Sequence, residues 1–291
     1  MEVLKNNPHI EKLLQHDESV KNENLEEHIQ WLKRKNHCDS VIDLNESIEV
    51  SLSQHPRSPN YKLTKGERLA RFNRNFYEYC FEHASIEPPD DPNGYRPELF
   101  FSPDELADTK TYLGNGFNIL VGMSGSGNNK AWPYTEPLCE LICKEYPDVH
   151  IITVGDLKCQ LIEPVIEGRI TNLSGLVPMR TSMALTGLVD LVIAPDTGII
   201  HAAGCYDTPK ICLLGHNTKE CITKHFSNDY SIEADPSLSP CAPCLFLIYD
   251  MKLQCPVGEK YGASLCMENG IPLETVYNRF KEVYVKHQKG S

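Results

Sequence analysis

Residues 191–215 read LVIAPDTGIIHAAGCYDTPKICLLG, and this stretch decides the fold class. An apolar run at 191–194 ends in the polar turn 195–198, and a second apolar run occupies 210–214. Two short apolar runs joined by a polar turn and a short helical segment are typical of the strand–helix–strand unit of a parallel sheet. The stretch therefore predicts an α/β protein with a doubly wound parallel sheet.

The polar residues between the two runs form a candidate anion site. Ligands of parallel sheets bind at the carboxyl ends of the strands, where Asp196, Thr197, Gly198 and His201 lie. An Asp-Thr pair can cap the next helix and leave its first N–H groups for a phosphate. Gly198 lets the backbone approach a ligand, and His201 follows one turn later. The alternative is an ordinary N-cap aspartate with a histidine satisfied in the core.

Composition excludes several classes of protein. The chain has 291 residues, 41% of them hydrophobic, which is enough for two domains or one large one. A net charge of −12 argues against a general nucleic-acid binder, whose footprint is basic. The sequence has neither an apolar run of about 20 residues nor an N-terminal signal segment. We therefore expect a cytoplasmic protein whose twelve cysteines stay reduced unless they bind metal.

The two halves of the chain differ in regularity. In the second half, predicted strands alternate with predicted helices, which indicates a parallel sheet. The strands are expected at 117–122, 150–154, 170–172, 191–194 and 210–214, and the helices at 136–146, 182–188 and 272–286. The first half predicts helices at 26–35 and 65–83 and a short strand at 40–44. The proline-rich segment 84–104 has linker composition, so we divide the chain into domains 1–100 and 101–291.

A second candidate site follows the strand at 117–122. The sequence MSGSGNNKAWP, residues 123–133, places Ser124, Ser126 and Lys130 in a Gly/Ser loop between a strand and a helix. Backbone N–H groups of such a loop can cradle a phosphate, and Lys130 adds a positive charge. The loop matches neither the Walker A nor the GxGxxG pattern, and an ordinary surface loop would look similar. Its position on the same sheet lets it frame one anionic ligand together with Asp196.

A third candidate is Asp156, which follows the strand at 150–154. Acidic residues at such strand ends accept hydrogen bonds from ribose in nucleotide-binding sheets. A carboxylate that only stabilises its own turn is the alternative interpretation.

Four cysteines in the segment 239–268 suggest a metal site. Cys241, Cys244, Cys255 and Cys266 open with a CxxC pair and span 26 residues, a pattern that matches a tetrathiolate centre. Thiolates favour zinc or iron, and four protein ligands make such a metal structural rather than catalytic. The alternatives are four reduced cysteines, or a partial site used only in relatives.

Taken together, these motifs resemble glycosyltransferase family 9, the heptosyltransferases. The resemblance covers about residues 115–280. It is carried by the strand followed by Asp196-Thr-Gly-x-x-His201, by Pro209-x-x-x-Leu-x-Gly215, by Lys130-x-Trp-Pro133 and by the Cys-rich tail ending in Cys266-Met267. It implies a GT-B fold of two Rossmann-like domains and transfer of a sugar, with inversion, from a nucleotide-sugar donor such as ADP-heptose to a glycan or protein acceptor. Alternatives are a non-catalytic nucleotide-sugar-binding or scaffold protein and another GT-B enzyme such as an epimerase.

The resemblance also assigns roles. It implies that Asp196, Thr197, Gly198 and His201 contact the diphosphate and sugar of the donor, and that Asp156 lies near the nucleoside. Ser124, Ser126 and Lys130 would line the phosphate side, with Lys130 neutralising the leaving diphosphate. The resemblance implies no catalytic metal, and the acidic composition predicts no nucleic-acid partner. Peripheral contact with the inner face of the membrane and association with a partner chain or in an oligomer stay open.

One departure from the family concerns the catalytic base. The N-terminal domain of the family opens with a strand and a Gly-rich turn that carries an acidic base. This chain begins MEVLKNNPHIEKLL, which resembles the middle of that domain. The expectation is therefore an incomplete N-terminal domain in which no residue takes the role of base by motif. Asp43 follows a strand core, but that strand matches the middle of the family's domain and not its start, so Asp43 is not assigned as the base.

Overall fold

Six parallel strands form the single sheet of the described part of this computed structural model, which comprises residues 2–14, 19–20, 24–42, 44, 59–123, 125, 127–246, 255 and 263–290. The strands are β1 Phe117–Gly122, β2 Val149–Val154, β3 Ile170–Asn172, β4 Leu191–Pro195, β5 Lys210–Leu214 and β6 Ile232–Glu233. Their order is β3-β2-β1-β4-β5-β6, and every neighbouring pair is parallel. This is the strand order of the Rossmann fold, so the predicted α/β class is confirmed.

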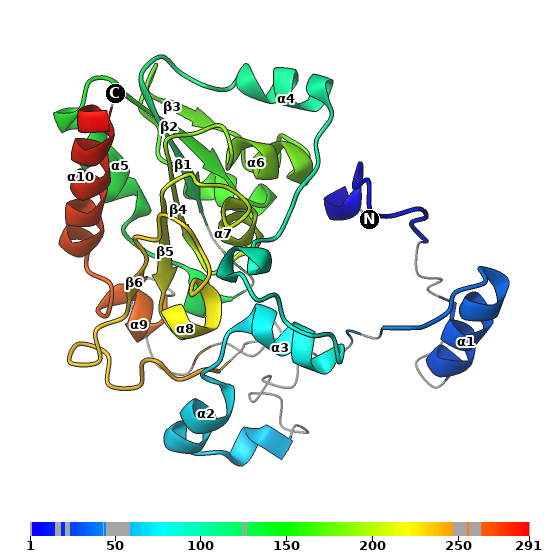
Figure 1. Ribbon diagram of the computed structural model, residues 1–291. Coiled ribbons are helices and arrows are strands. Elements are labelled where there is room, and N and C mark those ends of the chain that lie inside the picture. Colours follow the sequence, from blue (N-terminus) through cyan, green and yellow to red (C-terminus); the bar gives the residue numbers. More distant parts are fainter. Residues whose placement is uncertain are drawn as a thin grey trace.

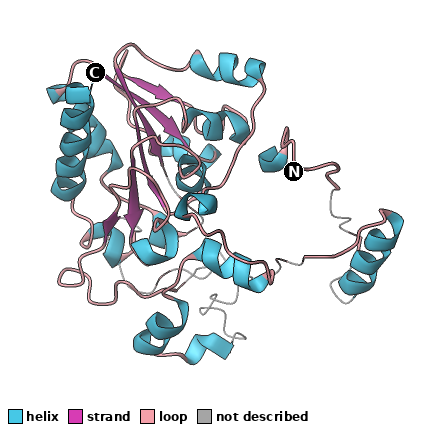
Figure 2. Cartoon of the chain, viewed as in Figure 1, coloured by secondary structure: helices cyan, strands magenta, loops and turns pink. Residues whose placement is uncertain are grey.

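Helices cover both faces of the sheet, as Figures 1 and 2 show. In Figure 1, α5 and α10 lie on one face, and α6 and α7 lie on the other. The α-helices are α1 Leu25–Lys35, α2 Lys65–Phe72, α3 Phe76–His83, α4 Pro103–Lys110, α5 Thr135–Glu145, α6 Met179–Leu185, α7 Gly198–Ala203, α8 Lys219–Ile222, α9 Leu265–Glu268 and α10 Leu273–Gly290. Short 3₁₀ turns are η1 Glu2–Leu4, η4 Pro59–Lys62, η5 Pro92–Tyr95, η6 Asn128–Lys130 and η7 Leu157–Leu161.

The core divides into two layers because alternate strand residues point to opposite faces. Ile119 and Ile193 pack with Phe280 of α10 on one side. Leu120 and Val192 pack on the other side, in the cluster that also contains residues of α6 and α7. Every residue of β1, β4 and β5 is buried, which explains why these strands, apart from Asn118 and Lys210, read as continuous apolar runs rather than alternating ones.

The expected helix at 65–83 is interrupted. Asn75 has an extended backbone, and its side-chain carbonyl accepts hydrogen bonds from the N–H groups of Tyr77 and Glu78, so it starts a second helix, α3. The side-chain amide of Asn75 also donates to the carbonyls of Glu220 and Cys221, which lie 145 and 146 residues further along the chain. This buried asparagine therefore fixes the start of α3 against the sheet domain.

The expected strand at 40–44 is wrong. The described residues there form no strand, and Val41, Ile42 and Leu44 are 41%, 53% and 51% exposed. Asp43 lies outside the described residues. A short apolar run needs a neighbouring strand to pair its backbone groups, and the described part of 1–100 supplies helices but no strand.

Helix α4 begins at the end of the proline-rich segment 84–104 and is not among the helices that the sequence predicts. Its start carries a capping box that the sequence shows: Ser102 accepts from the N–H of Glu105, and Glu105 accepts from the N–H of Ser102. Pro103 occupies the first helical position, where a missing N–H costs nothing.

Arg180 of α6 joins three distant segments. The guanidinium, in a residue only 4% exposed, donates to the carbonyls of Glu2 and Phe100 at 2.6 Å each, and it pairs with Glu105. Hydrogen bonding from Arg180 lowers the pKa of Glu105 to about 2. This one side chain therefore holds the segment near Glu2 and the segment near Phe100, before α4, against α6.

Among the described helices, none has the length and apolar character needed to cross a bilayer.

Candidate functional site

The two predicted loops meet at the carboxyl ends of β1 and β4. These strands are neighbours at the point where the strand order reverses, which is where ligands of such sheets bind. The loop after β1 folds onto the start of α7. A Cβ at Gly125 would lie 2.7 Å from Cβ of Lys130 and 3.0 Å from Cγ2 of Thr197. The structure therefore brings the Gly/Ser loop and the Asp196-Thr197-Gly198 turn to one site.

A buried carboxylate lies at the centre of this site. Asp196 is 5% exposed, and its Oδ1 lies 3.3 Å from Nε2 of His201. Its Oδ2 accepts a hydrogen bond from the side-chain amide of Asn217 at 2.8 Å and lies 3.4 Å from Nζ of Lys130. Nε2 of His216 is 4.0 Å from the same oxygen. The sequence-predicted residues Lys130, Asp196 and His201 thus form one cluster.

The charges of this cluster compensate one another. Burial opposes the ionised form of Asp196, but the charge of Lys130 and the hydrogen bond from His201 together hold its pKa well below the usual range. Burial, with help from Lys130, lowers the pKa of His216 to about 4, so this imidazole is neutral at pH 7. The Lys130 side chain remains 19% exposed. The site therefore contains an ion pair in which the lysine side chain is more exposed than the carboxylate.

Several groups beside the ion pair lack partners. The hydroxyl of Thr197 and the side-chain amide nitrogen of Asn129 are buried and have no hydrogen-bond partner within the described structure. A Cβ at Gly198 would meet no atom within 4 Å. Unpaired buried polar groups are costly, so a ligand that satisfies them gains affinity. These features suit a polar ligand lying against the start of α7.

The expectation that the Asp-Thr pair caps α7 is wrong. Thr197 occupies the N-cap position but makes no side-chain capping bond. The carboxylate of Asp196 instead bonds side chains from other elements. His201 is five residues from Asp196 and was part of the predicted site, whereas Asn217 is 21 residues away and no local spacing indicates it.

Asp156 occupies the end of β2, and its carboxylate bonds its own turn. It accepts hydrogen bonds from the N–H groups of Lys158 and Cys159 at 3.0 and 3.2 Å. Contact with a nucleoside therefore stays a prediction. Ser124 and Ser126 lie outside the described residues.

Three residues of the cluster were missed by the sequence reasoning. His216 and Asn217 follow β5, the strand beside β4, and both are 2% exposed. Tyr77 of α3 reaches the site from a distant segment, and its hydroxyl lies 3.4 Å from Nδ1 of His201. Their place after β5 was a usable signal for the first two, because the carboxyl ends of adjacent parallel strands share an edge. No spacing rule connects Tyr77 with His201.

The four tail cysteines lie near one another. Burial raises the pKa of Cys266 to about 12 and that of Cys244 to about 11, with smaller contributions from the other thiols of the group. The N–H of Phe246 donates to the sulfur of Cys244 at 3.5 Å. As placed, no three His, Cys, Asp or Glu side chains of the described residues are arranged to hold a metal ion. The donor chemistry fits a soft metal, but the side-chain geometry does not show a formed centre.

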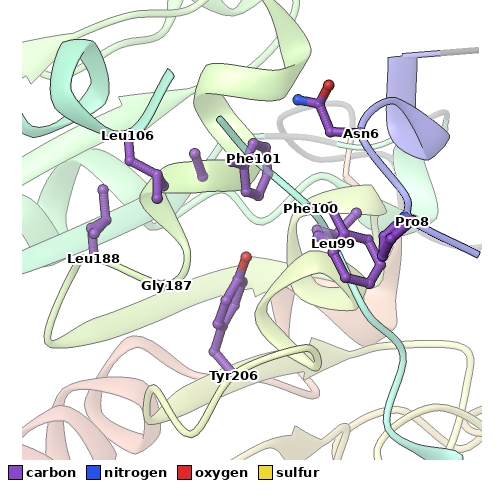
Figure 3. A pocket seen from close by; sticks show the side chains of 10 residues that line it. Asn6, Pro8, Leu99, Phe100, Phe101, Leu106, Gly187, Leu188 and Tyr206 are labelled. Carbon is purple, nitrogen blue, oxygen red and sulfur yellow. The ribbon is translucent and has the colours of Figure 1, made fainter. Parts of the chain in front are cut away.

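A separate cavity of about 520 Å³ lies away from this cluster (Figure 3). Four parts of the chain line it: the N-terminal segment, the residues just before α4, α4 itself, and the stretch from α6 to Tyr206. The lining residues are Asn6, Pro8, Leu99, Phe100, Phe101, Leu106, Ala184, Gly187, Leu188 and Tyr206. Figure 3 shows Asn6 and Pro8 on one side and Phe101 and Leu106 on another. No predicted site residue lines it, so it is distinct from the Asp196 cluster.

Comparison with known proteins identifies the family. The sequence profile of glycosyltransferase family 9 (heptosyltransferase) matches residues 77–244, more than half of the chain. The chain belongs to glycosyltransferase family 9. The match begins at Tyr77 and includes every described residue of the Asp196 cluster. Comparison with curated proteins finds no match.

Solved structures of family 9 proteins share the fold. A family 9 glycosyl transferase from Veillonella parvula aligns with a TM-score of 0.64 at 15% identity, over 98% of this chain and 85% of its own. The ADP-heptose lipopolysaccharide heptosyltransferase II of E. coli aligns with a TM-score of 0.53 at 15% identity, over 74% of this chain. The iron-containing dodecameric glycosyltransferase TibC of enterotoxigenic E. coli aligns with a TM-score of 0.52 at 15% identity, also over 74% of this chain.

This chain spans 63% of the length of heptosyltransferase II and 56% of that of TibC. At these identities the likeness concerns the fold, which is the Rossmann-like α/β fold of GT-B glycosyltransferases. A shared fold does not determine activity, donor or acceptor, which depend on the residues of the site.

Proposed function

We propose that this protein is an inverting glycosyltransferase that binds a nucleotide-sugar, with ADP-heptose as the donor, and transfers the sugar to a hydroxyl of a glycan or protein. In this proposal residues 101–291 form the donor-binding domain, and residues 1–100 contribute to the acceptor side. The single observation that carries the proposal is the Lys130–Asp196 pair at the carboxyl ends of β1 and β4. Membership of family 9 and the TibC complex with ADP-D-beta-D-heptose support the choice of donor.

The chemistry follows from charge. Cleavage of the bond between sugar and diphosphate leaves negative charge on the leaving group, and a positioned cation stabilises that charge as it develops. The ammonium of Lys130, oriented by the carboxylate of Asp196, supplies the cation. The open backbone at Gly198 and the unpaired hydroxyl of Thr197 supply the polar surface on which the diphosphate lies.

A donor screen tests this proposal. Calorimetry with ADP-, GDP- and UDP-sugars, followed by product analysis, should show binding of the ADP-sugar and its consumption. Lys130→Ala should weaken binding and Asp196→Ala should abolish it, whereas Lys144→Ala on the exposed side of α5 should change nothing. Unchanged affinity in Asp196→Ala would show that the site is assigned wrongly.

One observation favours a second candidate, a protein that binds the donor without turnover. A carboxylate whose pKa is held far below its usual range is a poor acceptor of protons, so Asp196 does not serve as the catalytic base. The proposal assigns the base to no described residue. Binding of ADP-sugar without any consumption would favour this second candidate. Product identity separates a transferase from an epimerase.

We also propose that Cys241, Cys244, Cys255 and Cys266 hold a structural zinc or iron. The mutual influence of their thiols and the iron in TibC support this assignment. When bound, such a metal would stabilise the fold, because the unfolded chain does not hold the four cysteines in place to bind it. Metal analysis should find about one equivalent per chain, lost in Cys266→Ser and kept in Cys38→Ser. A native mass without metal would contradict the assignment.

A further inference from the structure

The Asp196 carboxylate is buried, so it acts on a ligand through other side chains. Its two oxygens are shared among four side-chain partners, and only 7% of the side chain is exposed. The side chains of Lys130 and His201 are more accessible, at 19% and 36% exposed. The geometry of donor binding therefore depends on the side chains that hydrogen-bond to Asp196 and His201 on their buried sides.

Asn217 fixes the carboxylate. Its amide nitrogen lies 2.8 Å from Oδ2 of Asp196 and 3.3 Å from Nε2 of His216. Because burial keeps His216 neutral at pH 7, its Nε2 can accept a hydrogen bond. The amide then donates one hydrogen to Asp196 and the other to His216. Asn217 is 2% exposed, so both donors are used inside the protein.

Tyr77 fixes the imidazole. An ionised carboxylate only accepts hydrogen bonds, so Nε2 of His201 must carry the hydrogen that faces Asp196. In the neutral ring Nδ1 is then an acceptor, and the hydroxyl of Tyr77, 3.4 Å away, donates to it. Asn75 anchors the start of α3 to the carbonyls of Glu220 and Cys221, which holds Tyr77 in place.

We propose that Asn217 and Tyr77 are positioning residues of the donor site. Asn217 orients Lys130 through the carboxylate of Asp196, and Tyr77 holds the ring orientation of His201, whose tautomer Asp196 sets. This inference rests on the proposed function, because it gives the arrangement its purpose in binding a diphosphate.

The test combines a ring-nitrogen spectrum with nucleotide binding. Long-range ¹H–¹⁵N correlation, with His201→Gln to assign the signals, should show hydrogen on Nε2 of His201 and a hydrogen-bonded Nδ1. In Tyr77→Phe the Nδ1 signal should move to that of a free ring nitrogen, and the Kd for ADP should rise about 3- to 10-fold, the value of one hydrogen bond. Asn217→Ala should raise the Kd by about 10-fold or more. Tyr79→Phe makes the same chemical change on the same helix and should alter neither readout.

The outcomes separate the inference from the proposed function. Unchanged His201 signals in Tyr77→Phe, or a Kd in both variants within twofold of the wild type, would overturn the inference. A wild-type protein that binds no nucleotide would overturn the proposed function, and the ring-nitrogen signals would then decide the Tyr77–His201 assignment alone. Because Tyr77→Phe removes one oxygen and keeps the ring, this variant should fold.

Discussion

The buried ion pair makes a quantitative prediction about stability. Asp196→Asn keeps the size of the side chain, removes its charge and leaves Lys130 without its carboxylate partner. Removal of one partner of a buried pair costs about 3–5 kcal/mol. Because Lys130 is 19% exposed and keeps some hydration, we expect the lower end, about 3 kcal/mol. Urea unfolding followed by circular dichroism measures this difference.

A double-mutant cycle isolates the pair itself. Lys130→Met retains most of the aliphatic stem but removes the ammonium. If the two charges stabilise each other, Asp196→Asn combined with Lys130→Met should cost less than the sum of the single changes, by about 1–3 kcal/mol. Strictly additive changes, within about 0.5 kcal/mol, would refute the reasoning that Asp196 holds Lys130.

The same pair has a pH signature. Burial opposes ionisation of Asp196, but the charge of Lys130 and the hydrogen bond from His201 outweigh this effect and lower the pKa of Asp196 in the folded state. The stability from its ionised form is therefore present above the unfolded pKa, about 3.9, and is lost as the pH falls toward the folded value. Asp196→Asn should remove that part of the acid-side loss.

Four further predictions concern other residues. Burial lowers the pKa of His216 to about 4, below the value of about 6.5 in the unfolded chain. The unfolding free energy, measured by urea titration, should therefore fall by about 3 kcal/mol as the pH drops from about 6.5 to 4. In His216→Gln the fall over the same pH range should be smaller. Gly215→Ala would place its Cβ 2.6 Å from Sδ of Met267 and should lower stability by about 1–3 kcal/mol. Gly198→Ala meets no atom within 4 Å, so its melting temperature should stay unchanged while calorimetry shows weaker ADP binding. Arg180→Met should increase hydrogen exchange at residues 2–10; equal exchange in both proteins would contradict the anchoring role.

The parts of the fold that sequence predicted are those decided by local pattern. Apart from Asn118 and Lys210, β1, β4 and β5 are apolar because helices cover both faces of the sheet, and this pattern can be recognised in the sequence. The meeting of Lys130 and Asp196 also followed from sequence, since the carboxyl ends of adjacent parallel strands share one edge.

What sequence could not supply depends on contacts between distant residues. Tyr77 and His201 are 124 positions apart, and neither carries a local signal of the other. The run at 40–44 has the local pattern of a strand but lacks a paired neighbour in the described part of the chain, so pattern alone misled. The break before Asn75 was foreseeable, because asparagine favours helix starts over helix interiors.

The anchoring of residues near Glu2 by Arg180 has a consequence for folding during synthesis. The two contacting residues are 178 positions apart, so closing this contact organises a long stretch of chain and belongs to the slow, non-local events of folding. Residues near Glu2 leave the ribosome before Arg180, because they are 178 positions earlier in the chain. The contact between Glu2 and Arg180 therefore cannot form until α6 has been synthesised.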